Sequence, residues 1–298
     1  MHSRHLTAIF AYILILALPA HPAISHAADE TVSDQPGGPL KRIISRISTT
    51  RESVMLSAAC EPGTITFRKG EAGCSRCPSY TGQAGDAGAF TIESIITGTF
   101  LKPSANEALL NMSGCESRAD ASGGIILLRQ GKVGWNRIWY QPGHQLTDCL
   151  KFRTTTNLVS LLCNRSDIAQ GIETGELVWV IPGEDGPMVN PLISWHDNIQ
   201  SNPRDLLVIY PSRMLRSDFN QDGRADVRVT FRLLEHRIPE KYGGALDAIE
   251  QNYQLPEAEK LGVIYLFDGT NLAPHAKSEP AIKAIRALLK KQTGESGE

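Results

Sequence analysis

The sequence predicts a mostly β fold, made of β-propeller-like or β-sandwich units with a short N-terminal helix and a C-terminal helix. From residue 60 onward, short runs of alternating apolar and polar residues are separated by Gly, Pro, Asn and Asp. Many short strands with turn residues between them are typical of all-β sandwiches and propellers. Helical spacing of apolar residues is confined to residues 40–47, 246–253 and 280–291.

The expected strands follow one another along the chain, separated mostly by turn-rich segments. They cover residues 64–67, 90–95, 108–112, 124–129, 137–140, 149–153, 158–163, 177–181, 206–210, 227–233 and 263–267. A propeller shows a regular period of roughly 40–50 residues. The spacing here is irregular, so the choice between propeller-like and sandwich-type units stays open.

The first 27 residues have the three parts of a cleavable signal peptide. Arg4 gives a basic start, residues 6–20 are almost wholly apolar, and Ser25-His26-Ala27 supplies the small-residue pattern before cleavage. A membrane anchor is the alternative, but it needs about 20 apolar residues. We therefore expect a secreted or periplasmic protein without a membrane span after signal cleavage.

Charge gives no reason to expect nucleic acid as a partner. The 298 residues carry 30 Lys and Arg against 32 Asp and Glu, a formal net charge of −2. Binding to nucleic acid or to an anionic membrane surface usually requires a basic excess. We expect an unknown protein or glycan as the ligand.

Composition divides the exported part into three regions. Residues 28–59 form a polar leader and a short helix, and residues 60–181 form a β region that carries all the cysteines. A Pro- and Gly-rich segment at residues 182–191 is the candidate boundary. Residues 192–298 then form a second β region that ends in a helix.

An even number of cysteines on an exported chain predicts disulfide bonds, because the compartment is oxidising. Cys149 and Cys163 flank two β runs joined by a turn at residues 154–157. Antiparallel pairing about that turn brings the two cysteines almost opposite each other, where a bridge can form. We expect this pair to be bonded.

Cys74 and Cys77 form a CxxC pair with three possible interpretations. A redox site needs a low-pKa thiolate in a thioredoxin-like context, which the flanking sequence does not show. A zinc site needs a second ligand pair, and His144 and Cys115 are distant in sequence. We favour structural disulfides that join Cys60 and Cys115 to this pair, with the pairing left open.

Residues 218–226 place oxygen-bearing side chains at alternate positions of the sequence Asp-Phe-Asn-Gln-Asp-Gly-Arg-Ala-Asp. Calcium takes 6–8 oxygen ligands, so such a loop can wrap one ion. Gly223 permits the sharp turn, and Val229 stands where an EF-hand has its bidentate Glu. The alternative is an Asn- and Asp-rich turn without an ion. The pattern predicts a structural Ca²⁺ site.

This loop, which leads directly into a β pattern, resembles the calcium loops of FG-GAP and VCBS-like bacterial β-repeat proteins. The resemblance covers residues 206–270 and includes the strand and turn at residues 262–270. It implies four side-chain ligands and one backbone carbonyl ligand, from Asp218, Asn220, Asp222 and Asp226 and from Arg224 respectively. Those families use several such loops, whereas one is recognisable here.

No motif identifies a catalytic centre. Residues 194–197 place His196 beside Asp197, but neighbours in a chain do not orient each other as a triad does. The sequence has no Gly-x-Ser-x-Gly elbow. We interpret His196 and His144 as loop or turn residues. Three aromatic residues that could stack on a sugar are more often packing residues in strands: Trp135, Trp139 and Tyr140.

The preferred function is therefore an exported non-enzymatic binding or structural protein, stabilised by disulfides and by one calcium ion. The first alternative is a secreted hydrolase whose catalytic groups converge from distant loops. The second is an envelope thiol–disulfide protein that uses Cys74 and Cys77. An acid pair in a cleft would favour the hydrolase, and an unbridged, solvent-facing CxxC pair would favour the redox protein.

Overall fold

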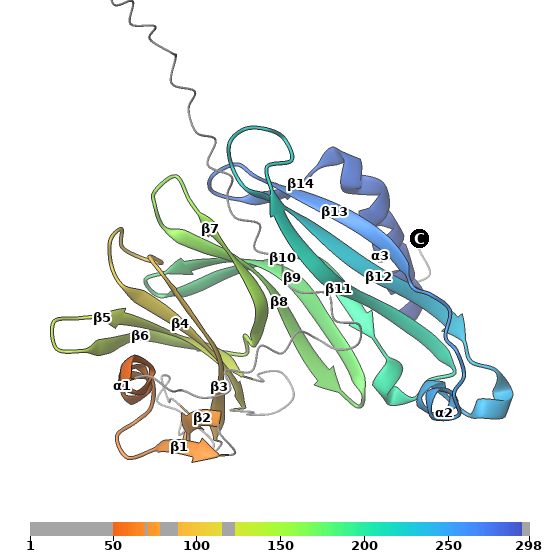
Figure 1. The fold of residues 1–298 in the computed structure, drawn as a ribbon, viewed down its shortest axis with the longest axis horizontal. Helices are drawn as coiled ribbons and strands as arrows, with labels where there is room; N and C mark the ends of the chain where they lie inside the picture. The colour runs from red at the N-terminus through yellow and green to blue at the C-terminus, as the bar shows by residue number, and fades with distance from the viewer. Residues whose placement is uncertain (1–49, 69–70, 78–88, 115–122, 294–298) are drawn as a thin grey trace, which may run out of the picture.

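A computed structural model describes residues 50–68, 71–77, 89–114 and 123–293. The predicted signal peptide at residues 1–27, the helix at residues 40–47 and Cys115 lie outside these residues. The described strands form two antiparallel sheets (Figure 1). The mostly β prediction is confirmed.

Each sheet is a meander in which sequence neighbours pair. The six-stranded sheet contains β1 (Ile65–Arg68), β2 (Glu71–Cys74), β3 (Phe90–Gly98), β4 (Glu107–Gly114), β5 (Gly124–Gln130) and β6 (Trp135–Pro142). The eight-stranded sheet contains β7 (Leu146–Arg153), β8 (Val159–Ala169), β9 (Ile172–Gly183), β10 (Gly186–Asp197), β11 (Asp205–Ser217), β12 (Asp226–Arg237), β13 (Glu259–Phe267) and β14 (Leu272–Pro274).

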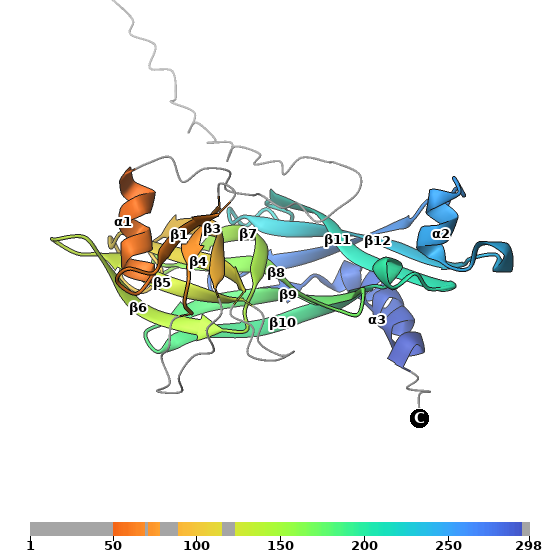
Figure 2. The ribbon, with the colours of Figure 1, turned by 90° about the horizontal axis from the view of Figure 1, so that it is seen from below.

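The helices lie at the margins of the two sheets. They are α1 (Thr50–Ala59), α2 (Ala245–Glu250) and α3 (Glu279–Thr293), with 3₁₀ turns at Ile199–Ser201, Glu240–Tyr242 and Ala276–Ser278. Figure 2 shows α1 and α3 near opposite ends of the molecule, with α3 on the side away from the face seen in Figure 1. The predicted C-terminal helix is confirmed in α3. Helix α1 was not predicted from the sequence, although Met55, Leu56 and Ala59, which are buried, have helical spacing.

The sheets share an apolar core. Leu109, Ile125 and Leu127 of the six-stranded sheet lie in one cluster with Leu161 and Val178 of the eight-stranded sheet. The Trp139 indole N–H also donates to the Gly183 carbonyl at 2.8 Å. Strands β4, β5, β8 and β9 are therefore buried on both faces, which explains their continuous apolar runs.

The eight-stranded sheet curls around a second core. Phe152 of β7 and Phe267 of β13 lie with ring centroids 5.2 Å apart, although several strands separate them in the sheet. The Thr155 N–H also donates to the Gly269 carbonyl at 2.9 Å. Ile282 and Ile285 of α3 pack into this core. The helix covers the concave side because its apolar stripe must leave water.

The predicted boundary at residues 182–191 lies on the β9–β10 hairpin, inside one sheet. The change of sheet occurs between β6 and β7, at residues 143–145. Pro and Gly here shape a long hairpin: Gly186 has φ +136°, and the register shifts next to Pro191. Proline within a sheet is expected at such a bulge, because it cannot donate to the ladder.

Candidate functional site

The predicted calcium loop connects β11 to β12 at one end of the eight-stranded sheet (Figure 1). Three of its side chains meet. The Asp222 N–H is shared by Asp218 Oδ1 and Asn220 Oδ1, each at 3.1 Å, and the Gly223 N–H donates to Asp218 Oδ2 at 2.8 Å. Asn220 Nδ2 lies 3.1 Å from Asp222 Oδ2. Alternate side chains therefore converge because the backbone turns around them, with Gly223 at φ +83°.

Asp226 has a separate role as an anchor of the loop. Its side chain is fully buried, and Oδ2 accepts from the N–H groups of Phe219 at 2.9 Å and Asn220 at 3.3 Å. Oδ1 accepts from the Phe267 N–H on β13 at 2.8 Å. One carboxylate thus ties the loop to the neighbouring strand.

A second turn lies against this loop. The Asp268 carboxylate accepts from the N–H groups of Thr270 and Asn271, both at 2.7 Å. A Cβ atom on Gly269 would lie 2.7 Å from Thr155 and 3.4 Å from Arg224 Nε, so glycine lets these segments approach. The N–H groups of Asn271 and Thr270 lower the pKa of Asp268. These two bonds therefore favour the ionised form of Asp268.

The oxygen donors of the loop fit a hard cation. The Arg224 N–H and the Asn220 amide are among the groups that lower the pKa of Asp222, with the Arg224 N–H making the largest contribution. Carboxylate and amide oxygens are calcium ligands. Asp218 Oδ1, Asp218 Oδ2 and Asn220 Oδ1 each accept one hydrogen bond and keep a lone pair, whereas Asp222 Oδ2 already accepts from Asn220 Nδ2 and from the Arg224 guanidinium. Among the described residues, no three His, Cys, Asp or Glu side chains form a metal-binding group. In this loop, two of the three converging side chains are carboxylates, those of Asp218 and Asp222, and the third is the amide of Asn220.

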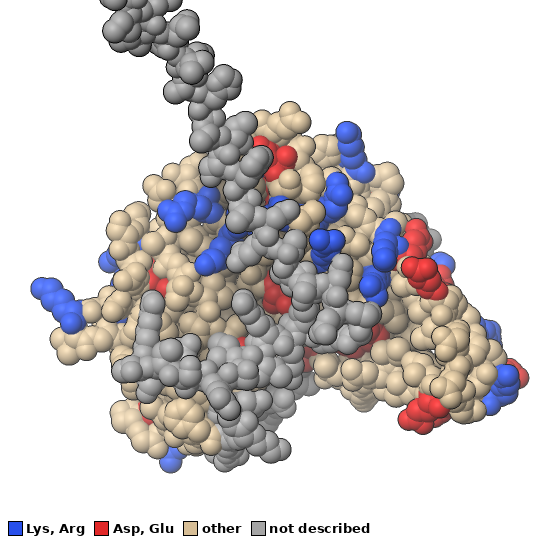
Figure 3. Space-filling view, viewed as in Figure 1, with Lys and Arg blue, Asp and Glu red and all other residues tan. Residues whose placement is uncertain are grey.

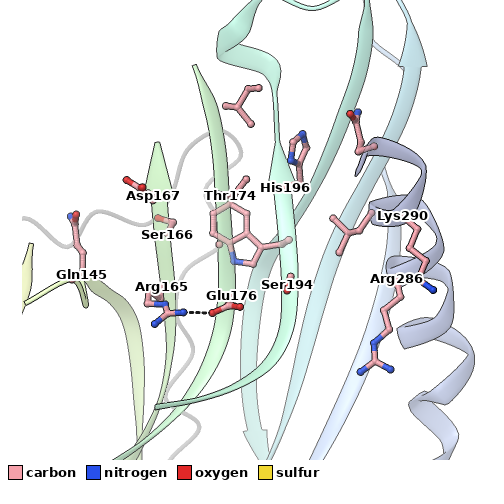
Figure 4. Close-up of a pocket in the computed structure, with 16 residues that line it drawn as sticks. Gln145, Arg165, Ser166, Asp167, Thr174, Glu176, Ser194, His196, Arg286 and Lys290 are labelled. Carbon is pink, nitrogen blue, oxygen red and sulfur yellow. Dashed lines mark hydrogen bonds and ion pairs between the residues drawn. The ribbon is translucent and has the colours of Figure 1, made fainter. Parts of the chain in front are cut away.

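A groove of about 940 Å³ lies between α3 and strands β8 to β10 (Figure 4). Apolar lining comes from Ile172, Trp195 and Leu289. Figure 4 shows the Arg165–Glu176 pair on the strands and Arg286 and Lys290 on α3 across from it. The groove thus has an apolar floor between two charged walls. No local sequence pattern predicts this groove, because residues far apart in the chain form it.

The wall on the strands is fixed by a three-residue chain. Arg165 forms an ion pair with Glu176, which faces it on β9. The other end of the guanidinium lies 3.2 Å from His144 Nδ1. Since a guanidinium can only donate, Nδ1 accepts and His144 is neutral. Burial, and then the charge of Arg165, lower the pKa of His144. The residue predicted as a turn histidine therefore orients an arginine of the groove.

The floor of the groove depends on a glycine. Trp195 packs flat on β9, where a Cβ atom at Gly175 would lie 2.3 Å from the indole. Only 6% of Trp195 is exposed, and the indole N–H has no hydrogen-bond partner in the described part of the chain. A side chain at position 175 would push the indole into the groove.

Asp197 and His196 have separate environments, as expected for strand neighbours that face opposite sides. Asp197 accepts from the Ile199 N–H at 2.9 Å and lies opposite Glu173. Burial raises the pKa of both acids, and their proximity raises the pKa of Glu173 further. Burial lowers the pKa of His196. Neither Glu173 nor Asp197 lines the groove. The hydrolase alternative stays a prediction.

The described cysteines are all disulfide-bonded. Cys149 and Cys163 are bonded, with Cα atoms 4.1 Å apart. Cys60 is bonded to Cys74, whose side chain is fully buried, and Cys77 is also disulfide-bonded. A redox role would need an exposed pair, so the thiol–disulfide alternative does not fit this arrangement. Two disulfides indicate an oxidising compartment outside the cytoplasm.

The aromatic residues considered for sugar stacking pack within the protein. Trp139 is buried between the sheets, while Trp135 and Tyr140 pack against the core beside α1. Burial raises the pKa of Tyr140. The packing interpretation is confirmed for all three.

Comparisons with known proteins give no relative. No family model, curated protein or solved structure matches the chain. Within the described ranges, no helix is both long enough and apolar enough to cross a membrane.

Proposed function

We propose that this chain is an exported binding protein whose ligand occupies the groove between α3 and β8–β10. The observation that carries the proposal is the groove itself, with a volume of about 940 Å³ and an apolar floor. Ligand sites in proteins are typically concave, largely apolar and lined by a few oriented polar groups. The predicted signal peptide and the disulfide bonds support export.

The lining selects a ligand with an apolar body and an anionic end. Trp195 and Leu289 offer apolar surface, and Arg286 and Lys290 stand one helical turn apart on the α3 wall. Arg165 on the opposite wall is already paired with Glu176. We therefore expect Arg286 on α3 to attract the anionic end.

Titration of the mature, oxidised protein with 8-anilinonaphthalene-1-sulfonate tests this proposal. We expect the fluorescence to rise and saturate as the probe binds. The affinity should fall about fivefold in Leu289→Gln, which loses an apolar contact, and about threefold in Arg286→Gln, which loses a charged contact. Leu246→Gln on α2 is the matched control, because Leu246 is also a partly exposed helical leucine. The proposal would be overturned if the wild type did not bind the probe, or if Leu289→Gln and Arg286→Gln bound it as tightly as the wild type does.

We further propose that the β11–β12 loop holds one structural Ca²⁺. Asp218, Asn220 and Asp222 would supply side-chain oxygens, Arg224 a carbonyl oxygen and Asp226 the ninth-position carboxylate. Asp218 and Asn220 both accept from the Asp222 N–H, and Asn220 Nδ2 donates to Asp222 Oδ2. This convergence supports the proposal, as does the resemblance to FG-GAP and VCBS-like repeats. The ion would neutralise the gathered carboxylates and fix the loop.

Thermal unfolding with calcium and with chelator tests the metal site. A ligand at about 100 times its dissociation constant stabilises the folded state by about 2.7 kcal/mol. We expect calcium to raise the melting temperature of wild type and of Asp185→Ala, an exposed aspartate at another hairpin. Asp222→Ala should lose the response. If millimolar calcium did not raise the melting temperature of the wild type, the loop would be an Asn- and Asp-rich turn without an ion.

A further inference from the structure

A second, smaller groove lies where the six-stranded sheet meets strands β7 and β11. Its volume is about 440 Å³, and its lining is predominantly polar. The residues come from the end of β3, the start of β4 and the connection between them, and from β7, β8 and β11. They include three cations, Lys151, Arg153 and Arg216. Figure 3 shows several Lys and Arg side chains spread over the face seen in Figure 1.

Among the described residues that line the groove, the one carboxylate is already neutralised. Glu107 has a fully buried side chain and accepts from Arg129 Nε at 2.7 Å. Its other oxygen accepts from the N–H groups of Phe100 at 2.5 Å and Leu101 at 2.7 Å. Both carboxylate oxygens of Glu107 are therefore already bonded, one to Arg129 and the other to the β3–β4 connection. The lining of the groove therefore has a net positive charge.

The three cations have no such partners. Within the described residues, the side chains of Lys151, Arg153 and Arg216 make no ion pair and no hydrogen bond. Arg216 Nε is buried and unpaired, and the guanidinium lies 5.2 Å above the Phe152 ring. A buried donor without an acceptor costs about 1–3 kcal/mol. The aromatic ring holds this donor in position for an acceptor that the chain itself does not supply.

We propose that this groove binds a phosphate monoester, with Arg216 as the anchoring residue and Lys151 and Arg153 as flanking cations. A guanidinium matches phosphate oxygens with paired N–H bonds, and lysine adds a point charge. The polar lining, which includes Thr97 and Asn106, suits a hydroxyl-bearing ester. The groove has room for a small phosphorylated molecule. It is separate from the α3 groove.

Calorimetry of the mature, oxidised protein at constant ionic strength tests the site, with glucose 6-phosphate, inorganic phosphate and glucose as probes. We expect both phosphates to bind and glucose not to bind. Arg216→Gln should weaken binding about tenfold and Lys151→Gln about threefold. Arg228→Gln is the matched control, because its guanidinium also lies over a ring, at 4.9 Å from Phe219, but outside the groove.

Three results would overturn the proposal: no phosphate binding at 10 mM (about −2.7 kcal/mol or weaker), equal weakening by Arg228→Gln, or unchanged binding in Lys151→Gln. Because Lys151 is exposed, that variant keeps the test valid should Arg216→Gln unfold. Phosphate should not displace anilinonaphthalene sulfonate from the α3 groove. The phosphate site can therefore fail or succeed independently of the proposed function.

Discussion

Replacing Asp226 by alanine should be among the most destabilising single changes in the eight-stranded sheet. The carboxylate is fully buried and accepts from the N–H groups of Phe219, Asn220 and Phe267. Loss of the acceptor leaves the buried Phe267 N–H unpaired, at about 1–3 kcal/mol. The two partly buried loop bonds add about 1 kcal/mol each. The expected loss is about 3–5 kcal/mol.

Urea unfolding of the oxidised protein, followed by tryptophan fluorescence, measures this loss. Asp226→Asn retains one acceptor oxygen and should lose about 2–3 kcal/mol, because its NH₂ group faces a backbone donor. Asp205→Ala is the control: this aspartate lies at the start of β11, 80% exposed, and should change the unfolding free energy by less than about 0.5 kcal/mol. A loss below about 1 kcal/mol in Asp226→Ala would refute the reasoning.

Three further predictions follow from buried groups. The Cys60–Cys74 and Cys149–Cys163 bridges each span 14 residues, so replacing either pair by serine should cost about 3 kcal/mol in chemical unfolding. Glu107→Gln leaves Arg129 without its buried partner and should cost about 3–5 kcal/mol, whereas Glu184→Gln, an exposed partner of the same arginine, should cost less than about 0.5 kcal/mol. Burial lowers the pKa of His144, so its contribution to stability is present above pH 6.5 and is lost as pH falls below it. The melting temperature should fall between pH 7 and pH 5, and it should fall less in His144→Gln; an identical fall in both would contradict this prediction.

Local patterns predicted the elements whose chemistry is local. The alternation in β12 and the apolar stripe of α3 were recognisable because each element buries one face. The Cys149–Cys163 bridge followed from a single hairpin. Long-range arrangement was harder: Pro182 and Pro191 indicated a boundary, but they belong to one hairpin within the eight-stranded sheet. A turn between long strands and a linker between regions use the same residue types.

The grooves could not be predicted, because their residues come together only when the sheets curl. Arg165 meets His144 across the β6–β7 connection, and Trp195 lies flat because position 175 is a glycine. Neither of these two contacts follows from a periodic pattern in the sequence. The loop at residues 218–226 was recognisable for the opposite reason: its side chains converge within one turn.

Two of the proposed sites share the end of one strand pair, which makes them mechanically dependent. Ser217 pairs with Asp226 in the last rung of the β11–β12 ladder, and Arg216 pairs with Val227 in the rung before it. Asp226 anchors the calcium loop, and Arg216 anchors the phosphate groove, so a fixed loop also fixes the guanidinium. Since coupling between binding sites is reciprocal, removing calcium should weaken phosphate binding, and phosphate should tighten calcium binding by the same factor. Calorimetric titration of phosphate with calcium and with chelator measures this factor, which we expect to be about threefold. Equal phosphate affinity in both conditions would mean that the ladder holds Arg216 in place without the ion.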